Sequence, residues 1–267
     1  MAPIISVITT CKGRLEHLQT TLPAIMALPD CEVIVVDYDC PDGAGAWVRA
    51  NFSAARVVQV TERPLFNVAR ARNLGAAAAT APWLLMLDAD VVASPGLVDA
   101  VRELLRPGIY LLADPRPPPL YGTMFVARED FEAIGGYDET FEGWGSEDID
   151  LTERLNLAGG RAGTFPGGLL AGVPHDNDIR GRFYEIPDLY INWGINALYR
   201  NVKFDLMRLG VSLNQGQARD LYSGVRAAML AADGPAHLNV VLPPRSVAER
   251  TLEATLTYRL APTEGQA

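Results

Sequence analysis

Long apolar runs, basic clusters and a cysteine framework are all missing from this 267-residue sequence. A transmembrane helix needs about 18 or more consecutive apolar residues, and no run approaches that length. The N-terminus runs directly into the apolar stretch 4–8 without the basic region of a signal peptide. We therefore expect no membrane span and no secretory leader.

The charge balance excludes one broad class of protein. Lysine and arginine total 23 against 32 aspartates and glutamates, which gives a formal net charge of −9. Nucleic-acid binding needs clustered cations to neutralise phosphates. The sequence therefore argues against a nucleic-acid partner, although a few local cations suffice for one small phosphorylated ligand.

Cysteine is scarce in this sequence. The three cysteines, Cys11, Cys31 and Cys40, are odd in number and lack the spacing of metal ligands. This pattern indicates a reducing compartment and no disulfide framework, so we expect a cytoplasmic protein.

Hydrophobic residues make up 49% of the chain, which is typical of a globular protein. Apolar runs alternate with helical patterns in the first 90 residues, and this alternation predicts βαβ units, a parallel sheet and an α/β fold. The expected strands are 4–9, 32–37, 56–60 and 83–87, and the expected helices are 14–28, 43–52 and 67–79. Ligands of such sheets bind beyond the carboxyl ends of the strands, where four acids fall: Asp37, Asp39, Asp88 and Asp90.

The rest of the chain predicts a less regular arrangement. We expect a helix from Ser94-Pro95 to Leu105, a stiff extended connector at 115–119 and a glycine-rich segment at 159–172. The remaining predicted strands are 109–113, 122–127, 238–243 and 250–260, and the remaining helices are 129–134, 187–209 and 217–232. Residues 1–180 are expected to form one domain, with a nucleotide half at 1–92 and an acceptor half at 93–180. Residues 181–267 form an extension for acceptor binding or homo-oligomerisation.

The segment Gly143–Asp150 carries the densest chemical signal. Two glycines around Trp144 favour a turn that comes close to a ligand, and tryptophan offers a face on which a sugar ring stacks. Ser146 is a suitable N-cap for the helix that follows, and the helix dipole favours acids in its first turn. Such acids often only stabilise a helix, so the segment alone leaves a structural role open.

Helical phase separates these acids. Asp148 shares a line with Leu151, Leu155 and Ala158, whereas Glu147 and Asp150 follow a more polar line with Arg154. An acid at the head of the apolar stripe is a candidate catalytic base. The helix dipole lowers its pKa, and burial raises it.

Asp88-Ala89-Asp90 follows a buried strand and is a candidate metal site. Two carboxylates one residue apart bind hard divalent cations, and an imidazole such as His175 with a carboxylate suits Mn²⁺ or Mg²⁺. A pair of loop acids and a surface histidine is the alternative.

Cations near the predicted strand ends favour a phosphate ligand. Arg72 lies near a helix N-terminus and can meet a diphosphate, or it can pair with an acid such as Asp37. Thr10, Lys12 and Arg14 follow the first strand and could line the same ligand, although Lys12 alone fits a solvated side chain equally well.

These segments, in this order, resemble the family 2-type glycosyltransferases of GT-A fold. The resemblance covers about residues 4–178 and is carried by Ser6–Thr10, Val35–Asp37, Ala71–Gly75 and Leu87–Asp90. Gly135–Glu139 and Gly143–Asp148 look like the acceptor-side segment of β-1,4-galactosyltransferases and chondroitin-polymerase-like domains. The sequence departs from the pattern at Lys12-Gly13, at Asp37–Cys40 and at Ile149.

The resemblance implies roles for the donor-side residues. Thr10 and Asp37 would hold the nucleotide base, and Arg72 would lie near the base or the diphosphate. Asp88 would contact the ribose or the metal-bound phosphates, and Lys12, Asp39 and Ala89 complete the predicted donor site.

The same resemblance implies roles on the metal and acceptor side. Asp90 and His175 would bind Mn²⁺ or Mg²⁺. Trp144 would stack on the sugars, Glu147 would orient the acceptor, and Asp148 would be the catalytic base.

The expected activity is metal-dependent, inverting transfer of a hexose from a UDP-sugar to the hydroxyl of a glycan, lipid-linked or protein acceptor. A GDP- or dTDP-sugar donor, a retaining reaction and a noncatalytic sugar-nucleotide or glycan-binding module are the alternatives. A nucleotidyltransferase is disfavoured because no glycine-rich, lysine-bearing phosphate loop follows the first strand.

Overall fold

The computed structural model describes residues 2–174, 181–231, 236–247 and 250–260. By its internal contacts the chain divides into two compact units, one of residues 1–139 and 147–187 and the other of residues 140–146 and 188–267. The first unit is built on a central sheet, and the second is built on two long helices. The role of the second unit in acceptor binding or oligomerisation stays a prediction.

The first unit holds a seven-stranded sheet in the order β3-β2-β1-β4-β7-β6-β8. Its strands are β1 (Ile5–Cys11), β2 (Cys31–Tyr38), β3 (Arg56–Val60), β4 (Trp83–Met86), β6 (Ile109–Asp114), β7 (Met124–Ala127) and β8 (Arg161–Pro166). β1 to β4 run parallel, and β7 is antiparallel to both β4 and β6. The expected strands of the first half are therefore confirmed.

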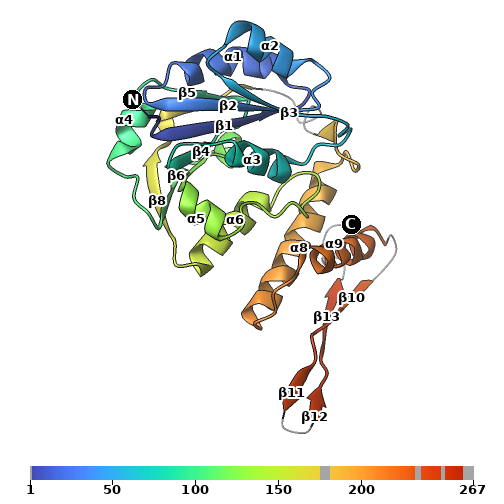
Figure 1. The fold of residues 1–267 in the computed structure, drawn as a ribbon. Coiled ribbons are helices and arrows are strands. Elements are labelled where there is room, and N and C mark those ends of the chain that lie inside the picture. The colour runs from blue at the N-terminus through green and yellow to red at the C-terminus, as the bar shows by residue number, and fades with distance from the viewer. Residues whose placement is uncertain (1, 175–180, 232–235, 248–249, 261–267) are drawn as a thin grey trace. The chain divides into compact units, whose positions relative to one another are not determined.

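Helices cover both faces of this sheet. The helices of the first unit are α1 (Leu15–Met26), α2 (Ala44–Asn51), α3 (Val68–Ala77), α4 (Leu97–Arg102), α5 (Arg128–Ala133) and α6 (Glu147–Leu157). Figure 1 shows α1 and α2 on one face of the sheet and α3, α5 and α6 on the other.

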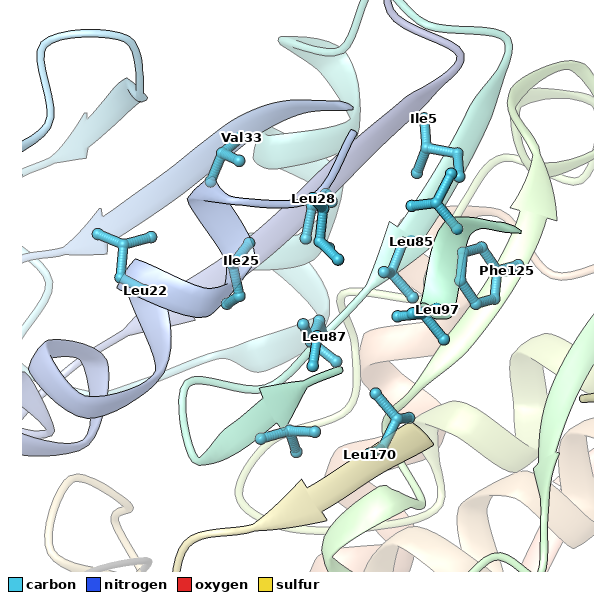
Figure 2. Close-up of a cluster of buried hydrophobic side chains, with 14 of the residues drawn as sticks. Ile5, Leu22, Ile25, Leu28, Val33, Leu85, Leu87, Leu97, Phe125 and Leu170 are labelled. Carbon is cyan, nitrogen blue, oxygen red and sulfur yellow. The ribbon is translucent and has the colours of Figure 1, made fainter. Parts of the chain in front are cut away.

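Successive side chains of a strand point to opposite faces of the sheet, so each strand contributes to a hydrophobic core on both faces. Ile5 and Val7 of β1 belong to the core that α1, α2 and α4 cover, whereas Ile8 belongs to the core beneath α3, α5 and α6. Figure 2 shows the first of these cores, in which Leu22 of α1 is fully buried. Burial of both faces explains why these strands read as continuous apolar runs.

Several local expectations are wrong. α4 begins at Leu97 after Gly96, so Ser94-Pro95 does not start the helix. The expected extended connector includes a 3-10 turn, η1 (Pro118–Leu120). The glycine-rich stretch, for which the sequence predicts no particular element, holds β8, a second 3-10 turn, η2 (Gly167–Leu169), and β9 (Leu170–Gly172).

A short ladder joins two distant parts of the first unit. β9 pairs antiparallel with β5 (Val91–Ala93), which directly follows Asp90. The next hydrogen bond runs from Val173 N to Asp90 O at 2.7 Å. This ladder places the residues just before His175 beside Asp90.

The second unit contains α8 (Leu189–Arg208), α9 (Gln215–Leu230) and two hairpin ladders. Asp188 caps α8 by accepting from two backbone N–H groups, and Asn214 with Gln217 forms a capping box on α9. β10 (Ala236–Val241) pairs with β13 (Thr255–Leu260), and β11 (Arg245–Val247) pairs with β12 (Arg250–Leu252), so the strand expected at 250–260 is split in two.

None of the helices in the described part of the chain combines the length and hydropathy that a bilayer crossing requires.

Candidate functional site

The site begins where three parallel strands end. β1, β2 and β4 run in the same direction, so their carboxyl ends meet at one edge of the sheet. Thr10 lies near the end of β1, Asp37 is the second-last residue of β2, and Asp88 follows β4 by two residues. The general rule for ligand sites in parallel sheets applies to this edge.

Arg72 of α3 joins the acids of this edge to the acids of α6. Its Nη2 donates to Asp88 Oδ1 at 2.8 Å, and its Nη1 donates to Asp148 Oδ1 at 2.8 Å and to Glu147 Oε1 at 3.2 Å. The Arg72 side chain is only 4% exposed. One buried guanidinium therefore joins Asp88 to the adjacent acids Glu147 and Asp148, which lie about sixty residues further along the chain.

Gly122 leaves the space that this cluster occupies. A Cβ at Gly122 would lie 2.4 Å from Arg72 Nη2 and 2.4 Å from Asp88 Oδ2. No side chain can be accommodated there while the ion pair keeps its geometry.

Burial changes the protonation of the two α6 acids. It is the largest cause that raises the pKa of Glu147 to about 8, and the neighbouring charge of Asp148 raises it further. Burial also raises the pKa of Asp148, against the lowering effect of Arg72. The balance between dipole and burial for Asp148 therefore falls on the side of burial, which makes its carboxylate more basic.

Tyr137 completes the surroundings of Asp148. Its hydroxyl donates to Asp148 Oδ1 at 3.3 Å, and the Arg72 guanidinium lies over its ring at 5.2 Å from the centroid. The tyrosine thus contacts both members of the Arg72–Asp148 ion pair.

The helical phase of the α6 acids was only partly predicted. Leu151 and Leu155 are buried as expected, but Ala158 is exposed beyond the end of the helix. Glu147 and Asp150, which the pattern places on a polar line, are buried at 6% and 0% exposure. Asp150 pairs with Arg154 at 2.7 Å.

Ser146 is not the N-cap that the sequence suggests. Its φ is +72°, outside the extended region of an N-cap, and its buried Oγ has no hydrogen-bond partner among the described residues. Gly143 and Gly145 both have positive φ, as the predicted glycine turn requires. Trp144 belongs to the second unit, where its carbonyl oxygen accepts from Asn196 Nδ2 at 3.2 Å.

Asp90, the second acid of the Asp88–Asp90 pair, lies in a turn that three contacts hold in place. Its side chain is 4% exposed, and Arg14 Nη1 lies 2.9 Å from its Oδ2. Thr21 of α1 donates to the carbonyl oxygen of Ala89 at 2.8 Å, and Val173 N donates to that of Asp90. The backbone of the acidic turn is therefore fixed on both sides.

The predicted metal site includes one residue that the structure does not describe. His175 lies outside the described residues, and no group of three His, Cys, Asp or Glu within them could hold an ion. Asp88 and Asp90 supply hard carboxylate oxygens that suit Mn²⁺ or Mg²⁺. Around them the acids Asp88, Asp90 and Asp148 outnumber Arg14 and Arg72 even when Glu147 is protonated, and this excess of negative charge fits a divalent cation.

Asp37 shapes the turn after β2. Its Oδ1 accepts from Cys40 N at 2.8 Å and its Oδ2 accepts from Gly45 N at 2.7 Å, and its side chain is buried. Asp39 has a positive φ, and its Oδ2 accepts from Arg63 N at 2.9 Å. Both carboxylates therefore hold backbone N–H groups of the surrounding loops.

Lys12 is buried rather than solvated. Its Nζ donates to the carbonyl oxygens of Tyr38, Asp39 and Arg63 at distances of 3.1, 2.9 and 2.8 Å. This one ammonium group fastens the loops that follow β1, β2 and β3.

Two aromatic residues near the site have no motif in the sequence. Phe183 packs on the backbone of Gly13, where a Cβ would lie 2.1 Å from its ring, and Lys12 Nζ lies 5.2 Å from the ring centroid. Tyr184 has its pKa raised, first by burial and then by the charge of Glu147, with opposing effects of Arg14 and Arg72. Only the nearness of these residues to His175 along the chain could have drawn attention to them.

Two family models match this chain. Residues 6–130 match the model of glycosyl transferase family 2. Residues 119–179, which include the Gly143–Asp150 segment, match the model described as the N-terminal domain of galactosyltransferase. Both models describe glycosyltransferase domains, and these two stretches of the chain are similar to them.

Curated relatives match part of the chain. A validoxylamine A glucosyltransferase of Streptomyces hygroscopicus subsp. jinggangensis is 29% identical, over 59% of this chain and 52% of that protein. The same enzyme from subsp. limoneus is also 29% identical, over 59% of this chain and 49% of its own length. The chain thus spans about half the length of these relatives.

Solved structures share the fold. A mannosyltransferase from Pyrobaculum calidifontis, in complex with GDP-Man and Mn²⁺, has a TM-score of 0.57 at 21% identity, over 87% of this chain and 76% of its own. Residues 1–349 of S. aureus TarS with UDP-GlcNAc give a TM-score of 0.59 at 14% identity, over 86% and 72%. The predicted GT-A fold, with a mostly parallel sheet between helices, is confirmed.

Proposed function

We propose that this protein transfers a hexose from a UDP-sugar to an acceptor hydroxyl, with inversion and with a divalent cation. The Arg72 cluster is the observation that supports it. Arg72 brings Asp88, an acid of the donor edge, within hydrogen-bonding distance of the same guanidinium as Glu147 and Asp148. A group-transfer site needs donor and acceptor acids in one place, and a helix that merely carries stabilising acids does not.

The proposed reaction uses Asp148 as the base. As the acceptor oxygen attacks C1 of the sugar, Asp148 takes its proton, and the bond from C1 to the diphosphate oxygen breaks on the opposite face. The nucleoside diphosphate leaves with that electron pair. The raised pKa of Asp148 favours this role, and the Tyr137 hydroxyl and Arg72 fix the orientation of the carboxylate.

Glu147 orients the acceptor in this proposal, and the stacking of Trp144 on the sugars stays a prediction from the sequence. Because the pKa of Glu147 is about 8, its carboxyl group holds a proton at neutral pH and can donate a hydrogen bond.

On the donor side, Asp88, Ala89, Arg72 and Thr10 lie against the diphosphate and the nucleoside. Lys12, Asp37 and Asp39 support this site through the loops that they fasten, since their polar atoms contact backbone groups. Asp90 and His175 would hold Mn²⁺ or Mg²⁺, and a bound cation would neutralise charge on the departing diphosphate.

The first experiment replaces Asp148 with Asn. We expect transfer to fall about 100-fold or more, as for loss of a general base, while binding of the donor remains. Asp99→Asn is the matched control because Asp99 also lies in the first turn of a helix, α4, outside the cluster. Retained turnover in Asp148→Asn would sink the assignment of the base.

The second experiment screens UDP-, GDP- and dTDP-sugars for Mn²⁺-dependent hydrolysis, and then determines the anomeric configuration of the product. UDP-sugar hydrolysis that is lost in Asp90→Ala supports the proposal, and a retained configuration refutes inversion. Hydrolysis of a GDP- or dTDP-sugar instead would replace UDP as the nucleotide of the proposed donor. Donor binding without any hydrolysis or transfer points instead to a binding module.

A further inference from the structure

Two cysteine sulfurs meet behind the donor edge of the sheet. Cys11 is the last residue of β1 and pairs in register with Asp37 of β2. Asp37 Oδ1 accepts the N–H of Cys40 at 2.8 Å, which folds the chain back toward β1. As a result, Cys11 Sγ and Cys40 Sγ lie 4.0 Å apart.

The two thiols have different surroundings. Cys11 is fully buried, whereas Cys40 is partly exposed. Cys40 Sγ accepts from Gly13 N at 3.2 Å, and the backbone N–H groups of Asp42 and of Ala44, the first residue of α2, help to lower its pKa. Backbone N–H groups at a helix N-terminus stabilise a thiolate.

The hydrogen bond between the sulfurs reinforces this difference. It is the largest cause that lowers the pKa of Cys40, to about 6, and the largest that raises the pKa of Cys11. At neutral pH the pair is therefore a thiolate at Cys40 with a protonated thiol beside it.

We propose that Cys40 is a peroxide-reactive thiol and that Cys11 is its resolving partner. The Cys40 thiolate attacks one oxygen of a hydroperoxide, the O–O bond breaks, and the departing oxygen takes a proton, which leaves a sulfenic acid on Cys40. The Cys11 sulfur loses its proton and attacks the Cys40 sulfur, the S–O bond breaks, and water leaves. The two thiols are oxidised to a disulfide, and the hydroperoxide is reduced to an alcohol or water.

Disulfide formation deforms the donor edge. A disulfide is about 2.05 Å long, so the two sulfurs must close roughly half of their present separation. This movement displaces Cys40 Sγ from Gly13 N and pulls on the loop of Lys12, which fastens the turns after β2 and β3. We expect oxidation to weaken nucleotide binding, and this consequence alone rests on the proposed function.

Cys31 is the matched control within the same chain. It is also partly exposed, but burial is the largest cause that raises its pKa to about 12, and the charge of Asp30 adds to this effect. Its thiol is therefore protonated at neutral pH. Exposure alone would make Cys31 and Cys40 similar in reactivity, whereas the inferred pair makes them different.

The test treats the full chain with hydrogen peroxide and follows intact mass and peptide maps. We expect wild type and Cys31→Ser to lose two hydrogens reversibly, with a Cys11–Cys40 crosslink. Cys11→Ser should stop at a sulfenic acid that dimedone traps on Cys40, and Cys40→Ser should form no crosslink. In untreated wild type, iodoacetamide at pH 7 should label Cys40 about tenfold faster than Cys31 or more.

The labelling of the wild type needs no variant and so holds even if a substitution prevents folding. Faster labelling of Cys31, or an unmodified Cys40 after peroxide, overturns the proposal. Calorimetry with UDP and Mn²⁺ on reduced and oxidised wild type then tests the consequence. If neither form binds, the proposed function fails while the thiol chemistry stands. If both bind equally, only the coupling to the donor edge fails.

Discussion

Replacing Arg72 with methionine removes the cation that three carboxylates share. In wild type the folded-state pKa of Glu147 is about 8, above its ordinary value of 4.5, so the folded state keeps a proton that the unfolded state releases. Stability contributed by this neutral group is therefore present below pH 4.5 and is lost as pH rises to 8. The full loss is about 5 kcal/mol at 1.36 kcal/mol per pKa unit. Because Arg72 lowers this pKa, its removal extends the loss to higher pH.

The cost of Arg72→Met should therefore depend on pH. At pH 5 Glu147 is protonated and burial favours the protonated form of Asp148 as well, so loss of the contact with the partly exposed Asp88 dominates and costs about 1 kcal/mol. At pH 8 Glu147 of the variant still holds its proton, but an ionised Asp148 is left beside it without its cation, at a cost of about 3–5 kcal/mol. Urea unfolding followed by circular dichroism at the two pH values measures the difference.

Arg70→Met is the matched control. Arg70 lies on the same helix, but its side chain is 39% exposed and its ion pair with Glu139 spans 3.7 Å. We expect this substitution to change stability by less than about 1 kcal/mol at both pH values. An equal loss at pH 5 and pH 8 for Arg72→Met, or an equal loss for Arg70→Met, would refute the reasoning.

Three further substitutions test the same structure. Glu147→Gln should flatten the pH dependence of unfolding between pH 5 and 8 and raise stability at pH 8 by a few kcal/mol (about 2 or more), as measured by urea titration. Gly122→Ala should cost about 1–3 kcal/mol and lower donor hydrolysis, because its Cβ displaces the Arg72–Asp88 pair, whereas Gly168→Ala, with nothing within 4 Å of its added Cβ, should be nearly neutral. Leu22→Ala should lower the unfolding free energy by about 2–5 kcal/mol, since this fully buried side chain leaves a cavity between α1 and the sheet.

Local pattern predicted the first half of the fold well because its strands are buried on both faces. Short apolar runs such as that of β1, separated by helical stretches, are typical of buried parallel strands. The parallel arrangement then places Asp37 and Asp88 at one edge of the sheet. By contrast, β8 lies within a glycine-rich stretch. Its pairing with β6 comes from the sheet edge and not from its own propensity.

The site itself depends on contacts that no local pattern encodes. Among the described residues, the hydrogen-bond partners of Arg72 lie 16, 75 and 76 residues away along the chain and do not include Asp37, and the contact of Arg72 with a diphosphate stays a prediction. Likewise, Glu147 falls on a polar helical line and is nevertheless buried, because what covers a helix face is decided by tertiary packing. Residue types in the sequence suggested which side chains belong to the site, but only the fold determines which of them form ion pairs and hydrogen bonds with one another.

The β5–β9 ladder has a consequence for how the site is assembled during synthesis. Strands β1 to β4 and both acids of the Asp88–Asp90 pair leave the ribosome early, but Val173, which donates to Asp90, follows more than eighty residues later. Closing so long a loop costs conformational entropy before any contact offsets it. A nascent chain can therefore form the parallel half-sheet while its acidic turn still lacks one edge, and the donor site reaches its final form only after the acceptor half has been made.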